Sequence, residues 1–143
     1  MQMMMEQGIK FLVFAHHVEV MDGLQACVEK AGVRFMRIDG KTSLKAREAG
    51  VHGFQNDPNM KVAILSIQAA CSGITLTAAS NVVFAEICWN PSNLMQAEDR
   101  VHRIGQTRGV HIHYLLAKDS GDDFMWCVVP LLLLYSSLLY SSP

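Results

Sequence analysis

Short, continuous runs of apolar residues recur along the chain. The first, KFLVFA at Lys10–Ala15, has no polar alternation, which is typical of a strand buried on both faces. Four more strands are predicted, at Val33–Ile38 (VRFMRI), Lys61–Ser66 (KVAILS), Asn81–Ala85 (NVVFA) and roughly Val110–Leu116.

The segments between the first runs have the spacing of amphipathic helices. One helix is predicted over Val18–Ala31, with Gly32 as its stop. A weaker helix is predicted over Leu44–Phe54, because Gly50 and Gly53 fall inside it and each costs about 0.5–1 kcal/mol relative to Ala. Strands that alternate with helices indicate βαβ units, so we predict an α/β fold with a mostly parallel sheet flanked by helices.

A third helix is predicted to begin at Pro91 and to end at Gly105. On this helix Gln96, Arg100 and Arg103 lie at i, i+4 and i+7, so they share one face. Two guanidinium groups one turn apart suit a polyanion such as a triphosphate. The alternative is a solvated helix whose second arginine pairs with an aspartate one turn earlier, and the helix taken alone favours that alternative.

The sequence of this helix carries a resemblance. QAEDRVHRIGQ at 96–106 resembles, without a gap, the last conserved motif of the Swi/Snf-type DNA-dependent ATPases, within the second helicase superfamily. The resemblance implies that Arg100 and Arg103 are arginine fingers, which reach the γ-phosphate of ATP held by another lobe and neutralise charge in the transition state. It implies a supporting polar contact from Gln96, and a RecA-like lobe (the helicase C-terminal domain) as the fold.

A second motif follows the second predicted strand. RIDGKTS at 37–43 lies where a P-loop would lie, but the P-loop pattern requires a glycine where this chain has Phe35. The segment resembles instead a turn of the family's second lobe that lies near the DNA backbone. Lys41, Thr42 and Ser43 are therefore candidates for phosphate contacts, and an ordinary helix cap is an equally good interpretation.

A third motif follows the strand at Lys61–Ser66. The segment Ser66–Leu76 resembles the family's fifth motif, which couples DNA contact to the ATP cleft. Ser66 supplies a hydroxyl at the end of the strand, and Gly73 allows the backbone to approach a ligand closely. The alternative is a strand-to-helix turn built from small residues.

The composition of the chain adds few candidate site residues. The chain has 143 residues, half of them apolar, and a net charge of −1, which suits one ordinary domain without a global basic field. Its four cysteines form no CxxC pair, so no zinc site is indicated and reduced thiols are expected. The histidine pairs at 16–17 and 111/113 lack further converging ligands, and we interpret them as structural. We therefore predict no metal site.

The composition changes near the end of the sequence. Residues 127–143 carry no charge and repeat Leu-Leu-Tyr-Ser-Ser, and the apolar run is too short to span a membrane. We therefore expect three segments: an N-terminal extension at 1–9, the RecA-like lobe at 10–126, and a tail at 127–143 outside the fold.

The motifs together indicate a subgroup. KFLVFAHH, VVFAE, QAEDRVHRIGQT and IHYLLAK are most similar to the annealing helicases, the HepA-related, Swi/Snf A-like protein 1 group, with the Ran-binding zinc-finger annealing helicase as a near relative. The resemblance implies a nuclear, ATP-dependent motor that acts on single-strand/double-strand DNA junctions or forks in replication-fork remodelling and DNA repair. ATP and Mg²⁺ would be bound mainly by the first motor lobe, the expected partner of this one.

The sequence contains neither a P-loop nor an Asp-Glu-x-His box. Arginine fingers without the phosphates that they face do no chemistry, so we expect no significant ATPase activity from this polypeptide alone. The alternative function is that of a truncated, non-catalytic fragment that binds DNA or interferes with an intact partner.

Overall fold

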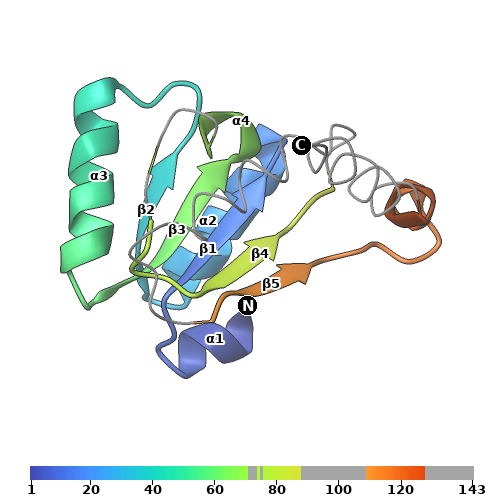
Figure 1. The fold of residues 1–143 in the computed structure, drawn as a ribbon, viewed down its shortest axis with the longest axis horizontal. Coiled ribbons are helices and arrows are strands. Elements are labelled where there is room, and N and C mark those ends of the chain that lie inside the picture. Colours follow the sequence, from blue (N-terminus) through green and yellow to red (C-terminus); the bar gives the residue numbers. More distant parts are fainter. Residues whose placement is uncertain (71–73, 75, 88–108, 128–143) are drawn as a thin grey trace, which may run out of the picture.

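The computed structural model describes residues 1–70, 74, 76–87 and 109–127. In this part of the chain five strands form one sheet in the order β2-β3-β1-β4-β5, and all neighbouring strands are parallel (Figure 1). Each strand overlaps its predicted range, so the parallel α/β class is confirmed. The strands are β1 (Phe11–Ala15), β2 (Arg34–Ile38), β3 (Met60–Ser66), β4 (Asn81–Phe84) and β5 (His111–Tyr114).

The central strand is β1, and all five of its residues are buried. It pairs with β3 on one side and β4 on the other, so that Phe14 lies beside Leu65 and Phe84 in register. A strand in this position meets a packed layer on each face, which explains why its sequence shows no polar alternation.

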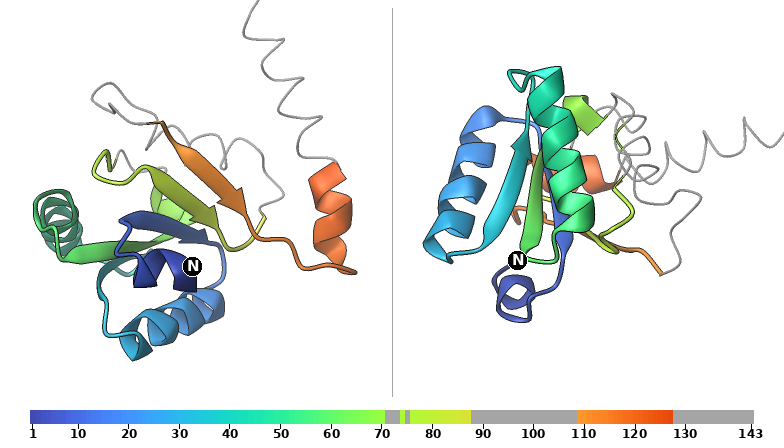
Figure 2. Two further views of the ribbon diagram at one scale, coloured as in Figure 1. Left: turned by 90° about the horizontal axis from the view of Figure 1, so that it is seen from below. Right: turned by 90° about the vertical axis from the view of Figure 1, so that its left-hand side faces the viewer.

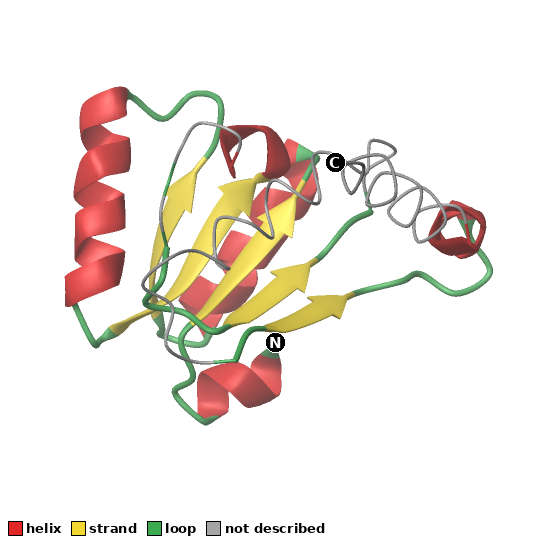
Figure 3. Ribbon diagram, in the orientation of Figure 1, coloured by secondary structure: helices red, strands yellow, loops and turns green. Residues whose placement is uncertain are grey.

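Helices cover both faces of the sheet, with α2 on one face and α3 on the other (Figures 2 and 3). Each face has its own cluster of buried apolar side chains, because successive residues of a strand point to opposite sides. Among the described residues no helix has the length and apolar character needed to cross a membrane. The labelled helices are α1 (Gln2–Glu6), α2 (Val18–Lys30), α3 (Leu44–Asn56) and α4 (Ile67–Ala70), and residues 121–127 are also helical.

The end of α2 confirms the predicted stop. Gly32 has a positive φ of 66°. Its N–H donates to Glu29 O (2.9 Å), and the N–H of Val33 donates to Val28 O (3.2 Å). This pair of bonds is the Schellman motif, which satisfies carbonyl groups left open at a helix end and favours glycine at the left-handed position.

The helix α1 was not predicted. Its Met4 is buried in the apolar cluster on the α2 face of the sheet. The N–H of Ile9 donates to Met4 O (2.9 Å), which connects the helix end to the segment before β1. Met4, together with the partly buried Met5, thus attaches this short helix to the core, and five residues are too few to give a periodic sequence signal. The segment boundaries at 9/10 and 126/127 stay predictions.

The glycines of α3 face the sheet. A Cβ added at Gly50 would lie 3.5 Å from Met36 Sδ, and one added at Gly53 would lie 3.2 Å from Met60 Cε. Because these positions lack side chains, the helix can approach the edge strand β2 and its neighbour β3 closely. The helix continues to Asn56, two residues beyond the predicted end.

A lysine from outside the helix contacts its C-terminal end. Lys10 Nζ donates to Phe54 O (2.5 Å) and Asp57 O (3.0 Å), and it lies 4.8 Å from the centroid of the Phe54 ring. A positive charge at this end complements the helix dipole and satisfies a terminal carbonyl. The pKa of Lys10 is lowered by burial and by the nearby Lys61, while Asp57 opposes the shift.

Aromatic rings connect β1 to the last described helix. Phe14 stacks on Phe84 with 5.2 Å between ring centroids, and Phe84 stacks on Tyr114 at 4.8 Å. Tyr114 then contacts Trp126, tilted, at 5.0 Å. The two stacked contacts follow from the parallel register of β1, β4 and β5, and together the three contacts connect the edge strand and the last described helix to the core.

We expect Gly50→Ala to raise the free energy of unfolding by about 0.5–1 kcal/mol, because the added Cβ makes an ordinary contact and the unfolded chain loses freedom. Gly53→Ala should gain less, because Met60 must move. Urea denaturation measures both, with Gly23→Ala in α2, where an added Cβ meets nothing within 4 Å, as the control. Greater stability for Gly53→Ala than for Gly50→Ala would contradict this packing argument.

Candidate functional site

Polar groups gather at the carboxyl ends of the strands, where open parallel sheets bind their ligands. All arrowheads of the sheet point to this edge (Figure 1). The edge carries His16 and His17 after β1, the turn at 39–43 after β2, Ser66 at the end of β3, and Glu86 shortly after β4. The structure therefore places two of the predicted motifs along one edge.

The turn after β2 is organised by Asp39. Its Oδ1 accepts hydrogen bonds from the N–H of Lys41 (3.0 Å) and the hydroxyl of Thr42 (3.1 Å). Thr42 Oγ1 in turn accepts from the N–H of Asp39 (3.0 Å), so this hydroxyl acts as donor and acceptor within the turn. The side chain of Lys41 is exposed.

Ser43 is the N-cap of α3. Its Oγ accepts from the N–H of Ala46 (3.3 Å), which confirms the helix-cap interpretation for this residue. A hydroxyl that accepts at a cap can still donate its own proton, so a cap and a phosphate contact are chemically compatible.

A guanidinium group holds the other oxygen of Asp39. Arg37 Nε donates to Asp39 Oδ2 (3.1 Å), and one terminal nitrogen donates to Asp22 Oδ1 (2.6 Å) and Gln25 Oε1 (2.9 Å). The Arg37 side chain is 20% exposed and therefore half-buried between β2 and α2. One side chain thus connects the turn to α2.

The charged groups of this network shift one another's pKa values. The hydrogen bond to Asp22 raises the pKa of Arg37, against the effect of burial. Burial alone would raise the pKa of Asp39, but the hydrogen bonds from Lys41, Thr42 and Arg37 outweigh burial and lower it. Asp39 is therefore a carboxylate at neutral pH and a strong acceptor for the turn.

A second carboxylate joins the loop after β1 to the end of β4. Glu86 Oε2 accepts from the backbone N–H groups of His16 (2.8 Å) and His17 (2.9 Å), and Oε1 lies 2.6 Å from His17 Nδ1. His17 is the N-cap of α2 and forms no capping bond through its own side chain. Glu86 therefore supplies the negative charge that the N-terminus of α2 favours.

Ser66 is buried, and its Oγ accepts from the N–H of Ala69 (3.0 Å) at the start of α4. The hydroxyl predicted at this strand end is present, and its observed contact is that of a helix cap. The small-residue turn considered in the sequence analysis thus describes the part of the motif seen in the structure.

The remaining predicted site residues, Gly73, Gln96, Arg100 and Arg103, lie outside the described residues. His111 and His113 are exposed on β5. Within the residues that the structure describes, no group of three or more His, Cys, Asp or Glu side chains could hold a metal ion.

Sequence reasoning missed the roles of Arg37, Asp39 and Glu86. Each acts through hydrogen bonds to groups that no periodic pattern connects, and Glu86 contacts a residue 70 positions away. The available signal was the position of each residue at the end of a predicted parallel strand, because those ends meet at one edge.

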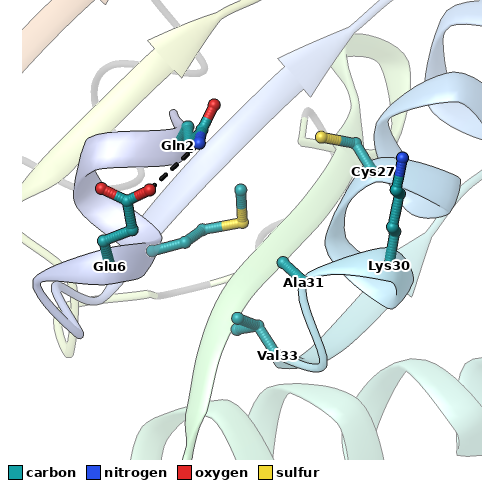
Figure 4. Close-up of a pocket in the computed structure, with 7 residues that line it drawn as sticks. Gln2, Glu6, Cys27, Lys30, Ala31 and Val33 are labelled. Carbon is teal, nitrogen blue, oxygen red and sulfur yellow. Dashed lines mark hydrogen bonds between the residues drawn. The ribbon is translucent and has the colours of Figure 1, made fainter.

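Two cavities lie at the opposite, amino-terminal edge of the sheet and contain none of the predicted site residues. One, of about 530 Å³, lies between α1 and the end of α2 (Figure 4). Gln2 and Glu6, joined by a 3.0 Å hydrogen bond, line it from one side, and Cys27 and Lys30 line it from the other. The second, of about 570 Å³, is lined in part by Lys10 and Lys61.

A parallel α/β lobe with polar loops along its carboxyl edge is a common framework for ligand binding. The sequence profile of the helicase conserved C-terminal domain matches residues 1–105, and the chain therefore belongs to that family. The C-terminal part of the Fun30 ATPase domain has the same fold, with a TM-score of 0.83 at 32% identity over 88% of this chain and 40% of that one. The predicted RecA-like lobe is thus confirmed.

Curated relatives are more similar in sequence. The human "DNA annealing helicase and endonuclease ZRANB3" is 53% identical over 127 residues, which cover 87% of this chain and 12% of the relative. The Xenopus tropicalis "SWI/SNF-related matrix-associated actin-dependent regulator of chromatin subfamily A-like protein 1" is 53% identical over 120 residues, covering 84% and 13%. The chain thus spans about an eighth of their length, and the resemblance to Swi/Snf-type annealing helicases is confirmed.

The His17–Glu86 pair should give stability a defined pH dependence. The hydrogen bond to Glu86 and the charge of Glu86 raise the pKa of His17 above its ordinary value of 6.5. The stability that His17 contributes is therefore complete below about pH 6.5 and is lost as the pH rises through the pKa of the folded state. Burial opposes the downward shift of the pKa of Glu86 from 4.5, but His17 and the backbone N–H groups outweigh it. The Glu86 contribution is therefore complete above about 4.5 and is lost as pH falls through its folded-state value.

Thermal melts of the wild type, His17→Ala, Glu86→Gln and the double variant across pH 3–9 test this pair. We expect the coupling between the two positions to be largest near pH 5–6 and to decrease on both sides. Coupling that is independent of pH would show that the ion pair does not form.

Proposed function

We propose that this chain is the second motor lobe of an ATP-dependent DNA translocase or annealing helicase that remodels replication forks in DNA repair in the nucleus. The observation that carries the proposal is the family match over residues 1–105, which include Gln96, Arg100 and Arg103. The identity of about 50% to an annealing helicase and to a Swi/Snf-related protein supports the finer assignment.

In the proposed mechanism this lobe supplies charge and not the nucleotide cradle. Arg100 and Arg103 act as arginine fingers, with Gln96 as a supporting contact, and Ser66 and Gly73 couple the cleft to DNA. ATP and Mg²⁺ provide the phosphoryl chemistry when they are held mainly by the first lobe. In the 39–43 turn the Asp39 carboxylate and the Thr42 hydroxyl are hydrogen-bonded to one another. This engagement supports a lobe that does not itself cradle the nucleotide.

The proposed DNA contacts lie on the turn after β2. Lys41 is exposed there and carries the charge that attracts a phosphate. Ser43 can add a hydroxyl donor beside it, while Thr42 contributes by holding the turn in shape. Contacts of this kind fix the register of a protein on DNA without reading its sequence.

The alternative is a non-catalytic DNA-binding or interfering fragment. The observation that favours it is the absence of a P-loop and of an Asp-Glu-x-His box from the sequence. This alternative shares the DNA contacts of the turn and differs in lacking any contribution to ATP hydrolysis.

We expect the chain alone to show no DNA-stimulated ATP hydrolysis, and activity to appear after addition of a separately purified first lobe of the same family. Arg100→Ala or Arg103→Ala should then reduce turnover by about 10³–10⁵-fold, the range typical of an arginine finger. A coupled assay of phosphate release measures each. A folded chain that gives no activity with the first lobe would favour the non-catalytic alternative.

We expect Lys41→Ala to weaken DNA binding and to reduce the dependence of log K on log salt by about 0.9, the contribution of one phosphate contact. Fluorescence anisotropy with a labelled single-strand/double-strand junction measures this at several salt concentrations. Lys30→Ala, on the exposed end of α2, is the matched charge control. Equal salt slopes for the wild type and Lys41→Ala would remove this contact from the proposal.

A further inference from the structure

The turn that carries Lys41 is held by a side chain outside the turn. Arg37 contacts Asp39 through Nε and α2 through a terminal nitrogen, which donates to Asp22 and Gln25. The guanidinium therefore fixes the carboxylate of Asp39 relative to a helix that packs on the sheet.

We propose that Arg37 is a positioning residue for DNA binding: it fixes the Asp39 carboxylate and, through it, the turn that presents Lys41 to a DNA phosphate. This inference rests on the proposed DNA contact of the turn. It adds a residue that does not itself touch DNA.

The geometry of the carboxylate supports the inference. One oxygen of Asp39 accepts from the Lys41 N–H and the Thr42 hydroxyl, and the other accepts from Arg37. A carboxylate bonded through one oxygen only can rotate, and the two bonds to the turn would then loosen together. The planar fork of an arginine can hold Asp39 and Asp22 at once, whereas a lysine ammonium is a point charge without this geometry.

Burial argues against a direct phosphate contact by Arg37. Its side chain is 20% exposed, and both Nε and one terminal nitrogen already donate to protein acceptors. Lys41, in contrast, is exposed at the tip of the turn. Arg37 therefore acts on DNA through Lys41.

A mechanism that depends on net charge alone predicts different effects of these variants on DNA binding. Asp22 is 61% exposed, so its replacement by alanine should leave the fold intact. If only net charge mattered, Asp22→Ala would strengthen DNA binding, because a negative charge is lost. If Arg37 positions the turn, Asp22→Ala weakens DNA binding, because the guanidinium loses an anchor. Likewise, Arg37→Lys keeps the charge and removes only the fork.

The experiment measures the affinity of the full 143-residue chain for the same junction DNA across salt concentrations. The variants are Arg37→Lys, Asp22→Ala, Lys41→Ala and the double variant Arg37→Lys/Lys41→Ala. Arg34→Lys is the matched control, because Arg34 lies on the same strand but pairs with Asp57 at the other end (2.6 Å). Hydrogen exchange of the Lys41 N–H reports on the turn itself.

We expect Arg37→Lys and Asp22→Ala each to weaken binding several-fold and to speed exchange of the Lys41 amide, while Arg34→Lys changes neither. The double variant should bind no more weakly than Lys41→Ala, because a positioning residue has no effect once its target is gone. Additive losses, or unchanged binding in Arg37→Lys beside weakened binding in Lys41→Ala, would overturn this inference alone. Unchanged binding in Lys41→Ala would overturn the proposed contact as well, and the inference with it.

Discussion

The burial of β1 on both faces is the constraint on which the other elements depend. A strand with five buried residues must have a hydrogen-bonded neighbour on each side and a packed layer above and below, and both neighbours of β1 are parallel. β3 and β4 each pair with β1, one on either side, and helices pack above and below the sheet. Because all the described strands are parallel, the loops that follow them converge on one edge, and the turn at 39–43, Ser66 and Glu86 meet there.

At that edge, carboxylates give the loops their shape. Asp39 organises the turn after β2, and Glu86 binds the backbone of the loop after β1. Asp39 accepts from one backbone N–H and Glu86 from two, and each also pairs with a cationic or titratable side chain. Each carboxylate therefore exchanges hydration for several fixed donors. This arrangement keeps exposed loops ordered without apolar packing, and it leaves the side chain of Lys41 exposed for an external anion.

The sequence predicted what depends on local patterns. Strands β1, β3 and β4 follow from short apolar runs, and Gly32 marks the end of α2 because only a few conformations close a helix there. Contacts between distant side chains have no such signature. The bonds of Glu86 to residues 16 and 17, and of Lys10 to the end of α3, connect positions that only the folded topology brings together. Arg100 and Arg103, whose role is inferred from the resemblance, lie outside the described residues.

The position of β1 in the chain has a consequence for synthesis. Of the five described strands the central one comes first in the chain, but its partner β3 ends at Ser66 and β4 ends at Phe84. At about 5–20 residues per second, the ribosome needs roughly 3–15 s to make the residues between the end of β1 and the end of β4. Until β4 is complete the most apolar strand of the sheet lacks at least one of its two neighbours, so its apolar residues cannot reach their final burial before then.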